Sequence, residues 1–173
     1  MDITENEILV RRARSLARAR AVDASVDENA GRDRYLVTRC GNERIAIRLT
    51  SLAEVYKPGS VTPLPRPTAP VWGLAAWRGR ILTVVTIGDC LPGSGPGMIA
   101  VLAEGSAAFA GVWINDVEVE EYIADDDIVS ARGMTGGREF FLTGTTGDAV
   151  LVLDATQLKV LLEREIPVSD KKQ

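Results

Sequence analysis

The clearest pattern in this chain is a strict alternation of side chains between residues 44 and 49. The two alternating sets are Ile45, Ile47 and Leu49 on one side and Arg44, Ala46 and Arg48 on the other. A period of two is typical of a β-strand that buries one face. A second apolar run at 35–40 precedes it, and the turn residues Gly41 and Asn42 lie between the two runs. The pattern therefore predicts a β-hairpin.

Short strand-like runs continue through most of the chain. Residues 80–87 are almost continuously apolar and rich in β-branched side chains, which predicts a strand buried on both faces. Further short strands are expected at 98–102, 110–114, 117–122, 139–143 and 149–153. Five prolines between positions 58 and 70 exclude a helix there and predict an extended connector. Many short strands at this spacing favour a barrel or a sandwich.

Helical periodicity is confined to the two ends. Thr4 and Glu7 fit a capping box, and the pattern predicts an amphipathic helix over 4–22. A short closing helix is expected over 155–164, before Pro167. We therefore expect three parts, and their ranges are 1–31 for the N-terminal amphipathic helix and linker, 32–165 for the main domain, and 166–173 for a flexible tail.

Composition narrows the possible functions. The 173 residues are 46% hydrophobic, enough for one domain with a substantial core. A net charge of −4 disfavours binding to nucleic acid or to an anionic membrane. No run of apolar residues approaches a membrane span and no secretory leader is evident, so we expect a cytoplasmic protein without direct membrane insertion.

The side chains that most often carry catalysis or bind metals are missing. The chain has no histidine, and its two cysteines, Cys40 and Cys90, form no Cys-x-x-Cys pair. The acidic residues between 116 and 127 lack the spacing of a calcium-binding loop. The sequence therefore predicts a protein that is not an enzyme and that has no cofactor, no metal site and no catalytic residue.

Five motifs occur in a characteristic order. They are YLV at 35, ERIAI at 43, LAEV at 52, VTPLP at 61 and GLAAWRGRILTVV at 73. Their order and spacing resemble those of the CheW-like domain, and the resemblance covers roughly residues 34 to 162. It implies an all-β fold of two small five-stranded SH3-like β-barrels that share a hydrophobic core, flanked here by the N-terminal and C-terminal helices.

The resemblance also implies a function and partners. It implies a non-enzymatic chemotaxis adaptor, recruited to membrane-associated receptor arrays, that couples a CheA-type histidine kinase to chemoreceptors. The residues that match the contact with the CheW-like regulatory domain of the kinase are Leu52, Glu54 and Val55. Those assigned to a receptor-tip contact, in a groove between the barrels, are Gly73, Arg78, Gly79, Val112 and Ile114. Trp77 beside Arg78 is a pairing found at interface hot spots.

Three positions depart from the family pattern. Ala76 stands where the family has asparagine, and Thr86 and Asn115 stand where it has aspartate. Each loss removes a hydrogen-bonding partner worth about 1 kcal/mol, which could change partner choice without changing the fold. Two alternatives follow, a decoy or non-motility chemosensory protein that binds one partner only, and a small β-barrel that binds nucleic acid.

Overall fold

The computed structural model describes residues 29, 31–88, 90–93, 95–131 and 141–165. The chain divides into two compact units, Met1–Arg32 and Asp33–Gln173, and the description below concerns the second. The helix expected at 4–22 and the tail expected at 166–173 lie outside the described residues. No helix in the described part of the chain is both long and apolar enough to cross a membrane.

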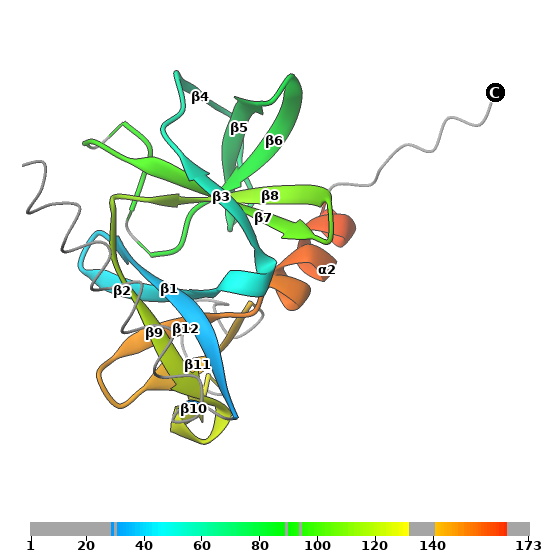
Figure 1. Ribbon diagram of the computed structural model, residues 1–173. Helices are drawn as coiled ribbons and strands as arrows, with labels where there is room; N and C mark the ends of the chain where they lie inside the picture. The colour runs from blue at the N-terminus through cyan, green and yellow to red at the C-terminus, as the bar shows by residue number, and fades with distance from the viewer. Residues whose placement is uncertain (1–28, 30, 89, 94, 132–140, 166–173) are drawn as a thin grey trace, which may run out of the picture. The chain divides into compact units, whose positions relative to one another are not determined.

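Two six-stranded sheets make up this unit (Figure 1). The first has the order β10-β11-β12-β2-β1-β9, and its β2 and β12 run parallel. Its strands are β1 (Arg32–Cys40), β2 (Glu43–Arg48), β9 (Asp116–Ala124), β10 (Ile128–Ser130), β11 (Leu142–Thr146) and β12 (Val150–Leu153).

The second sheet has the order β3-β7-β8-β6-β5-β4, and its β6 and β8 run parallel. Its strands are β3 (Leu52–Tyr56), β4 (Val61–Pro63), β5 (Val71–Trp77), β6 (Arg80–Val85), β7 (Met98–Glu104) and β8 (Ala107–Ile114). The short 3₁₀ helix η1 (Leu49–Ser51) leads from the first sheet into the second, and η2 (Asp125–Asp127) joins β9 to β10. Helix α2 (Ala155–Glu165) follows β12.

The predicted hairpin is β1 and β2, paired antiparallel from Tyr35 opposite Arg48 to Cys40 opposite Glu43. Both faces of β2 are buried, although the alternation indicated one. Ile45 and Ile47 belong to the larger core, which contains residues of both sheets, whereas Ala46 belongs to a smaller cluster formed within the first sheet. The larger core covers one face of the strand and the smaller cluster covers the other, and the arginines stand at its ends.

The all-β fold with a shared core and a short C-terminal helix is confirmed. Each sheet has six strands where five were expected, and each has one edge strand of only three residues, β4 and β10. Strand β4 ends at Pro63, inside the proline-rich connector. A proline is tolerated there because an edge strand leaves one side of its backbone unpaired.

Candidate partner-binding surfaces

The turn between β5 and β6 brings two predicted site residues to the surface. Arg78 and Gly79 form a two-residue loop, because Trp77 and Arg80 are directly paired. Both loop residues have positive φ, 46° at Arg78 and 75° at Gly79. Positive φ at both positions matches the right-handed twist of the flanking strands, and glycine adopts it without strain. The turn therefore requires glycine at position 79, and its geometry exposes the side chain of Arg78.

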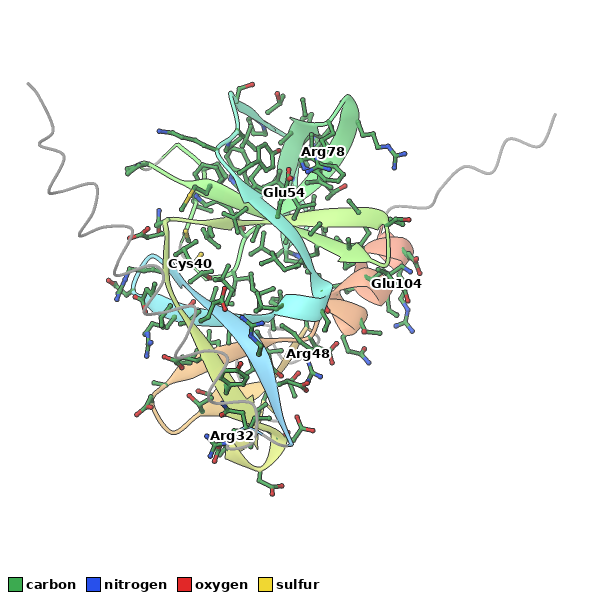
Figure 2. The ribbon with its side chains drawn as sticks, in the orientation of Figure 1. Arg32, Cys40, Arg48, Glu54, Arg78 and Glu104 are labelled. Carbon is green, nitrogen blue, oxygen red and sulfur yellow. The ribbon has the colours of Figure 1, made fainter. Side chains whose placement is uncertain are left out.

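Glu54 on β3 holds this turn. Its carboxylate accepts hydrogen bonds from the indole Nε1 of Trp77 and from the guanidinium of Arg78. Figure 2 shows Glu54 and Arg78 next to each other. The hydroxyl of Tyr56, also on β3, donates to the carbonyl of Ala76 at 3.0 Å. Strands β3 and β5 are not neighbours in the sheet order, so these side chains hold together two strands that no ladder joins.

The electrostatics of Glu54 follow from these contacts. The hydrogen bond from Trp77 lowers the pKa of the Glu54 carboxyl, with Arg78 adding to the effect and desolvation opposing it. The Arg78 guanidinium also lies 5.1 Å from the centroid of the Trp77 ring. The Glu54 side chain is 27% exposed and that of Arg78 is 68% exposed. A fixed anion is thus covered on one side by indole and on the other by an accessible cation.

An exposed isoleucine completes this region. Ile81 is 73% exposed, and it lies opposite the exposed Ala76 in the β5–β6 ladder. The expectation that 80–87 is buried on both faces is wrong at this position. Because Trp77 points inward, its neighbour Ala76 and the residue paired with Ala76 must point outward. Ile81 and Trp77 therefore lie on opposite faces of the hairpin. We call Glu54, Trp77 and Arg78, together with Ile81 on the other face beside the same turn, the hairpin-tip surface.

The remaining residues expected at the kinase contact flank this surface. Leu52 and Val55 lie on β3 with intermediate exposure, and both pack against the larger core. A register shift separates Leu52 from Glu54 where β3 pairs with β7. Successive side chains of a strand point to opposite faces, which explains why Glu54 reaches the turn while its neighbour Val55 does not.

Three of the residues expected at the receptor contact have structural roles. A Cβ at Gly73 would lie 2.3 Å from the carbonyl oxygen of Thr62, so only glycine lets β4 lie against β5 here. Val112 and Ile114 are 0% exposed, and both belong to the larger core. The pair does not line a groove in this structure, because both faces of β8 are buried from residue 110 to residue 114.

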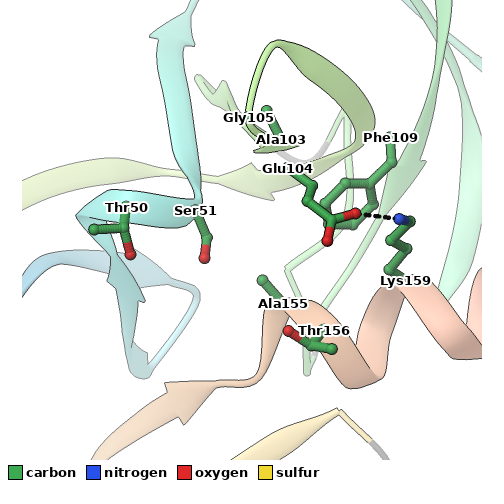
Figure 3. Close-up of a pocket in the computed structure, with 9 residues that line it drawn as sticks. All are labelled: Thr50, Ser51, Ala103, Glu104, Gly105, Phe109, Ala155, Thr156 and Lys159. Atoms are coloured by element: carbon green, nitrogen blue, oxygen red, sulfur yellow. Dashed lines mark hydrogen bonds and ion pairs between the residues drawn. The ribbon is translucent and has the colours of Figure 1, made fainter.

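A hollow does lie at one end of the second sheet, beside α2. The cavity has a volume of about 150 Å³ (Figure 3), and η1, the β7–β8 turn and the start of α2 form its walls. The residues that line it are Thr50, Ser51, Ala103, Glu104, Gly105, Phe109, Ala155, Thr156 and Lys159. An ion pair joins Glu104 to Lys159 and lowers the pKa of the Glu104 carboxyl. We call this the α2 cavity. None of the residues predicted for the receptor contact lines it.

The acidic strand β9 is covered by arginines. Glu118 accepts from the Nε of Arg44 at 2.7 Å and also pairs with Arg39, while Arg34 pairs with Glu120. The hydrogen bond from Arg44 is the main reason that the pKa of the Glu118 carboxyl is lowered. Within the described residues, no group of three or more acidic or cysteine side chains is arranged to hold a metal ion. We call this ladder of pairs on β1, β2 and β9 the charged face.

The three departures from the family pattern have different surroundings. The Oδ1 of Asn115 accepts from the backbone N–H of Gly41 at 2.7 Å, and its Nδ2 donates to the carbonyl of Pro96 at 3.2 Å. An aspartate could not make the second bond, because a carboxylate does not donate. The backbone N–H of Thr86 bonds to the carbonyl of Pro70. Ala76 has no side-chain hydrogen-bonding group, and its backbone carbonyl accepts a hydrogen bond from the Tyr56 hydroxyl.

The sequence profile of the CheW-like domain matches residues 34–161. The chain belongs to the CheW-like domain family. Among solved structures, it is similar to the scaffolding protein TtCheW from Thermoanaerobacter tengcongensis, with a TM-score of 0.56 and 21% sequence identity. That match covers 70% of this chain and 88% of the TtCheW chain, and at this identity it shows the fold. No curated protein sequence matches the chain. The CheW-like domain family is one of chemotaxis scaffolds and adaptors.

Proposed function

We propose that this CheW-like protein is a non-enzymatic adaptor that couples a CheA-type histidine kinase to the tip of a chemoreceptor. The observation that carries the proposal is the hairpin-tip surface. It combines a tryptophan, an arginine, a carboxylate and an exposed isoleucine, which is the composition of a small protein-binding hot spot.

We assign the kinase contact to this surface together with Leu52 and Val55. Ile81 supplies apolar area that binding would remove from water. The Glu54 carboxylate, fixed by Trp77 and Arg78, supplies a charge in one defined orientation. Arg78 and Gly79 were expected at the receptor contact, but their turn is bound to Glu54, so we place them on the kinase side.

A titration of the full chain against the CheW-like regulatory domain of a CheA-type kinase tests this assignment. We expect saturable binding that weakens at least about tenfold in Glu54→Lys, since reversal of this charge both removes the anion and repels Arg78. Glu120→Lys on the charged face is the matched control, because Glu120 is likewise an exposed glutamate paired with an arginine. Equal binding by wild type and Glu54→Lys would contradict the assignment.

We assign the receptor contact to the α2 cavity. The resemblance implies a groove between two barrels, and this cavity lies where η1 and α2, which follow strands β2 and β12 of the first sheet, meet the β7–β8 end of the second. The ring of Phe109 is half-exposed there, beside the side chains of Thr50 and Ser51. An apolar floor with a few polar groups and one ion pair at its rim suits the apolar face of a helical receptor tip.

Two tryptophan substitutions on adjacent residues of α2 test the receptor contact. Thr156 lines the cavity and Gln157 does not, and both are exposed. We expect Thr156→Trp to fill the cavity and to abolish co-sedimentation with receptor fragments, and Gln157→Trp to leave it intact. The kinase titration should be unchanged in both variants. Loss of kinase binding but not receptor binding in Thr156→Trp would reverse the two assignments.

The same pair of assays separates the adaptor from the two alternatives. A decoy would bind the kinase domain or the receptor fragment, but not both. Nucleic-acid binding finds little support, because Arg34, Arg39 and Arg44 already pair with carboxylates of β9.

A further inference from the structure

The two cysteines meet inside the protein, although they are far apart in the sequence. Cys40, labelled in Figure 2, ends β1 in the first sheet, and Cys90 lies in the connection between β6 and β7 of the second sheet. Both are free thiols, 1% and 2% exposed respectively. Asn115 brings them together: its Oδ1 lies 3.0 Å from the Cys90 Sγ, and it bonds to the backbone of Arg39 and of Gly41, the two neighbours of Cys40. Because the two cysteines form no Cys-x-x-Cys motif, their proximity could be found only from the fold.

The surroundings hold each thiol in place. The Cys40 Sγ lies 3.2 Å from the carbonyl oxygen of Ile87 and 3.4 Å from that of Trp113. The Cys90 Sγ lies 3.0 Å from the Oδ1 of Asn115, which also accepts from the backbone N–H of Gly41. These contacts hold both cysteines beside Asn115, so a disulfide would join two segments that are already neighbours.

The two thiols are chemically unequal. The hydrogen bond from Cys40 lowers the pKa of Cys90, and the backbone N–H of Gly41 adds to this effect against the opposing influence of burial. The pKa of Cys40 is raised, first by its bond to Cys90 and then by burial. These directions favour Cys90 over Cys40 as the thiol that ionises first.

The site also has a route for a small reagent. Leu91, next to Cys90, is 45% exposed. Gly41 is exposed and has no side chain, and a Cβ built on it would lie 4.0 Å from the backbone nitrogen of Cys90. Hydrogen peroxide is little larger than water, and local openings of a folded protein admit molecules of that size.

We propose that Cys40 and Cys90 form a reversible disulfide when the protein meets hydrogen peroxide, and that this bond joins the two sheets. The Cys90 thiolate attacks one peroxide oxygen, the O–O bond breaks, and Cys90 becomes a sulfenic acid while the other oxygen leaves as hydroxide and is protonated to water. The sulfur of Cys40 then attacks that of Cys90, the S–O bond breaks, and the departing hydroxide takes the Cys40 proton. Two thiols are oxidised by two electrons in all, and one peroxide is reduced to two waters.

The test uses the full, reduced chain treated with one to a few equivalents of hydrogen peroxide, then denatured and alkylated. We expect the wild type to lose the mass of two hydrogen atoms, to resist alkylation at both positions, and to recover on treatment with a dithiol reductant. The oxidised form should melt roughly 10 °C higher, because the bond closes a long loop in the unfolded chain. Thiols that stay reduced in the folded protein and react only after unfolding would overturn the proposal.

Two serine variants test the unequal roles. Cys40→Ser should stop at a sulfenic acid on Cys90 that a dimedone probe captures, whereas Cys90→Ser should give little capture at Cys40. Equal capture in the two variants would contradict the assignment of Cys90 as the nucleophile. The circular dichroism and melting temperature of each reduced variant show whether it is folded. The disulfide in the wild type does not depend on either variant, and it does not depend on kinase or receptor binding.

Discussion

The charged face and the hairpin-tip surface both pair arginine with glutamate, yet they differ in what surrounds the pairs. On the charged face, Glu118 is shared by two arginines and Glu120 is held by a third. At the hairpin tip, Glu54 is held by one arginine and by the indole of Trp77, and the exposed Ile81 lies nearby on the same hairpin.

We interpret this difference in terms of binding. The charged face pairs its own charges, whereas the hairpin-tip surface leaves groups that a partner could contact. Exposed ion pairs contribute little to stability, and a ladder of them mainly keeps an edge strand such as β9 soluble. A carboxylate fixed by a buried tryptophan, with an isoleucine left in water, leaves apolar area that only a partner can cover. The charged face has at least three arginines and two glutamates, against one of each at the hairpin tip. Its apolar residue Val119 is 43% exposed, whereas Ile81 is 73% exposed and lies beside a carboxylate that a tryptophan also holds.

The largest expected effect is a difference in stability between two isoleucine-to-alanine variants, one at a buried position and one at an exposed position. Ile114→Ala should lower the free energy of unfolding by about 3 kcal/mol, because Ile114 is wholly buried and its loss leaves a cavity. Ile81→Ala should change stability by less than about 0.5 kcal/mol, because Ile81 is exposed. Denaturant titrations measure both values.

Binding should show the opposite order. The folded fraction of Ile114→Ala should bind the kinase domain as the wild type does, whereas Ile81→Ala should bind several-fold more weakly. Val129→Ala is the control for Ile81, since Val129 is 66% exposed on β10 of the other sheet. Equal weakening by Val129→Ala and Ile81→Ala would contradict the assignment of Ile81 to the kinase contact.

A smaller effect is expected where the backbone of the hairpin tip is changed. Gly79→Ala should cost about 1 to 2 kcal/mol, because φ at this position is +75° and a Cβ is strained there. Gly59→Ala is the matched control, since Gly59 has an ordinary φ and nothing within 4 Å of an added Cβ. It should be neutral or slightly stabilising. Thermal unfolding of the two variants shows whether the loss of stability comes from the positive φ at position 79 or from the replacement of any glycine.

Much of the fold could be predicted from the sequence because its signals are local. The hairpin of β1 and β2, the break at the prolines and the closing helix all follow from alternation and turn residues within a few positions. The short edge strands β4 and β10 could not be predicted, because three residues carry no readable period.

The candidate site was less predictable because it depends on contacts between distant segments. The resemblance marked Glu54 and Arg78, but it assigned them to different partners, and only the fold shows that they touch. Val112 and Ile114 were assigned to a groove, although they are buried. The sequence of a strand does not distinguish an apolar side chain that faces a core from one that faces a groove. The outward direction of Ile81 could have been inferred from the two-residue turn at Arg78 and Gly79, which fixes the register.

The smallest expected effect is a pH dependence shared by the two surfaces. The folded protein lowers the pKa of Glu54 and of Glu118 below the ordinary value of 4.5. Each ionised carboxylate therefore stabilises the fold above that value, and the contribution is lost as the pH falls through the lowered pKa. Glu54→Gln and Glu118→Gln should each flatten the fall in stability on acidification, and each should differ most from the wild type near neutral pH.

Kinase binding should separate these two variants where stability does not. Near neutral pH, Glu54→Gln should weaken binding to the kinase domain, because the charge at the hairpin tip is lost, whereas Glu118→Gln should bind as the wild type does. Isothermal titration at pH 7, paired with melting curves from pH 3 to pH 7, measures both properties on the same samples. If Glu118→Gln weakened binding as much as Glu54→Gln, the charged face would have to be counted as part of the interface.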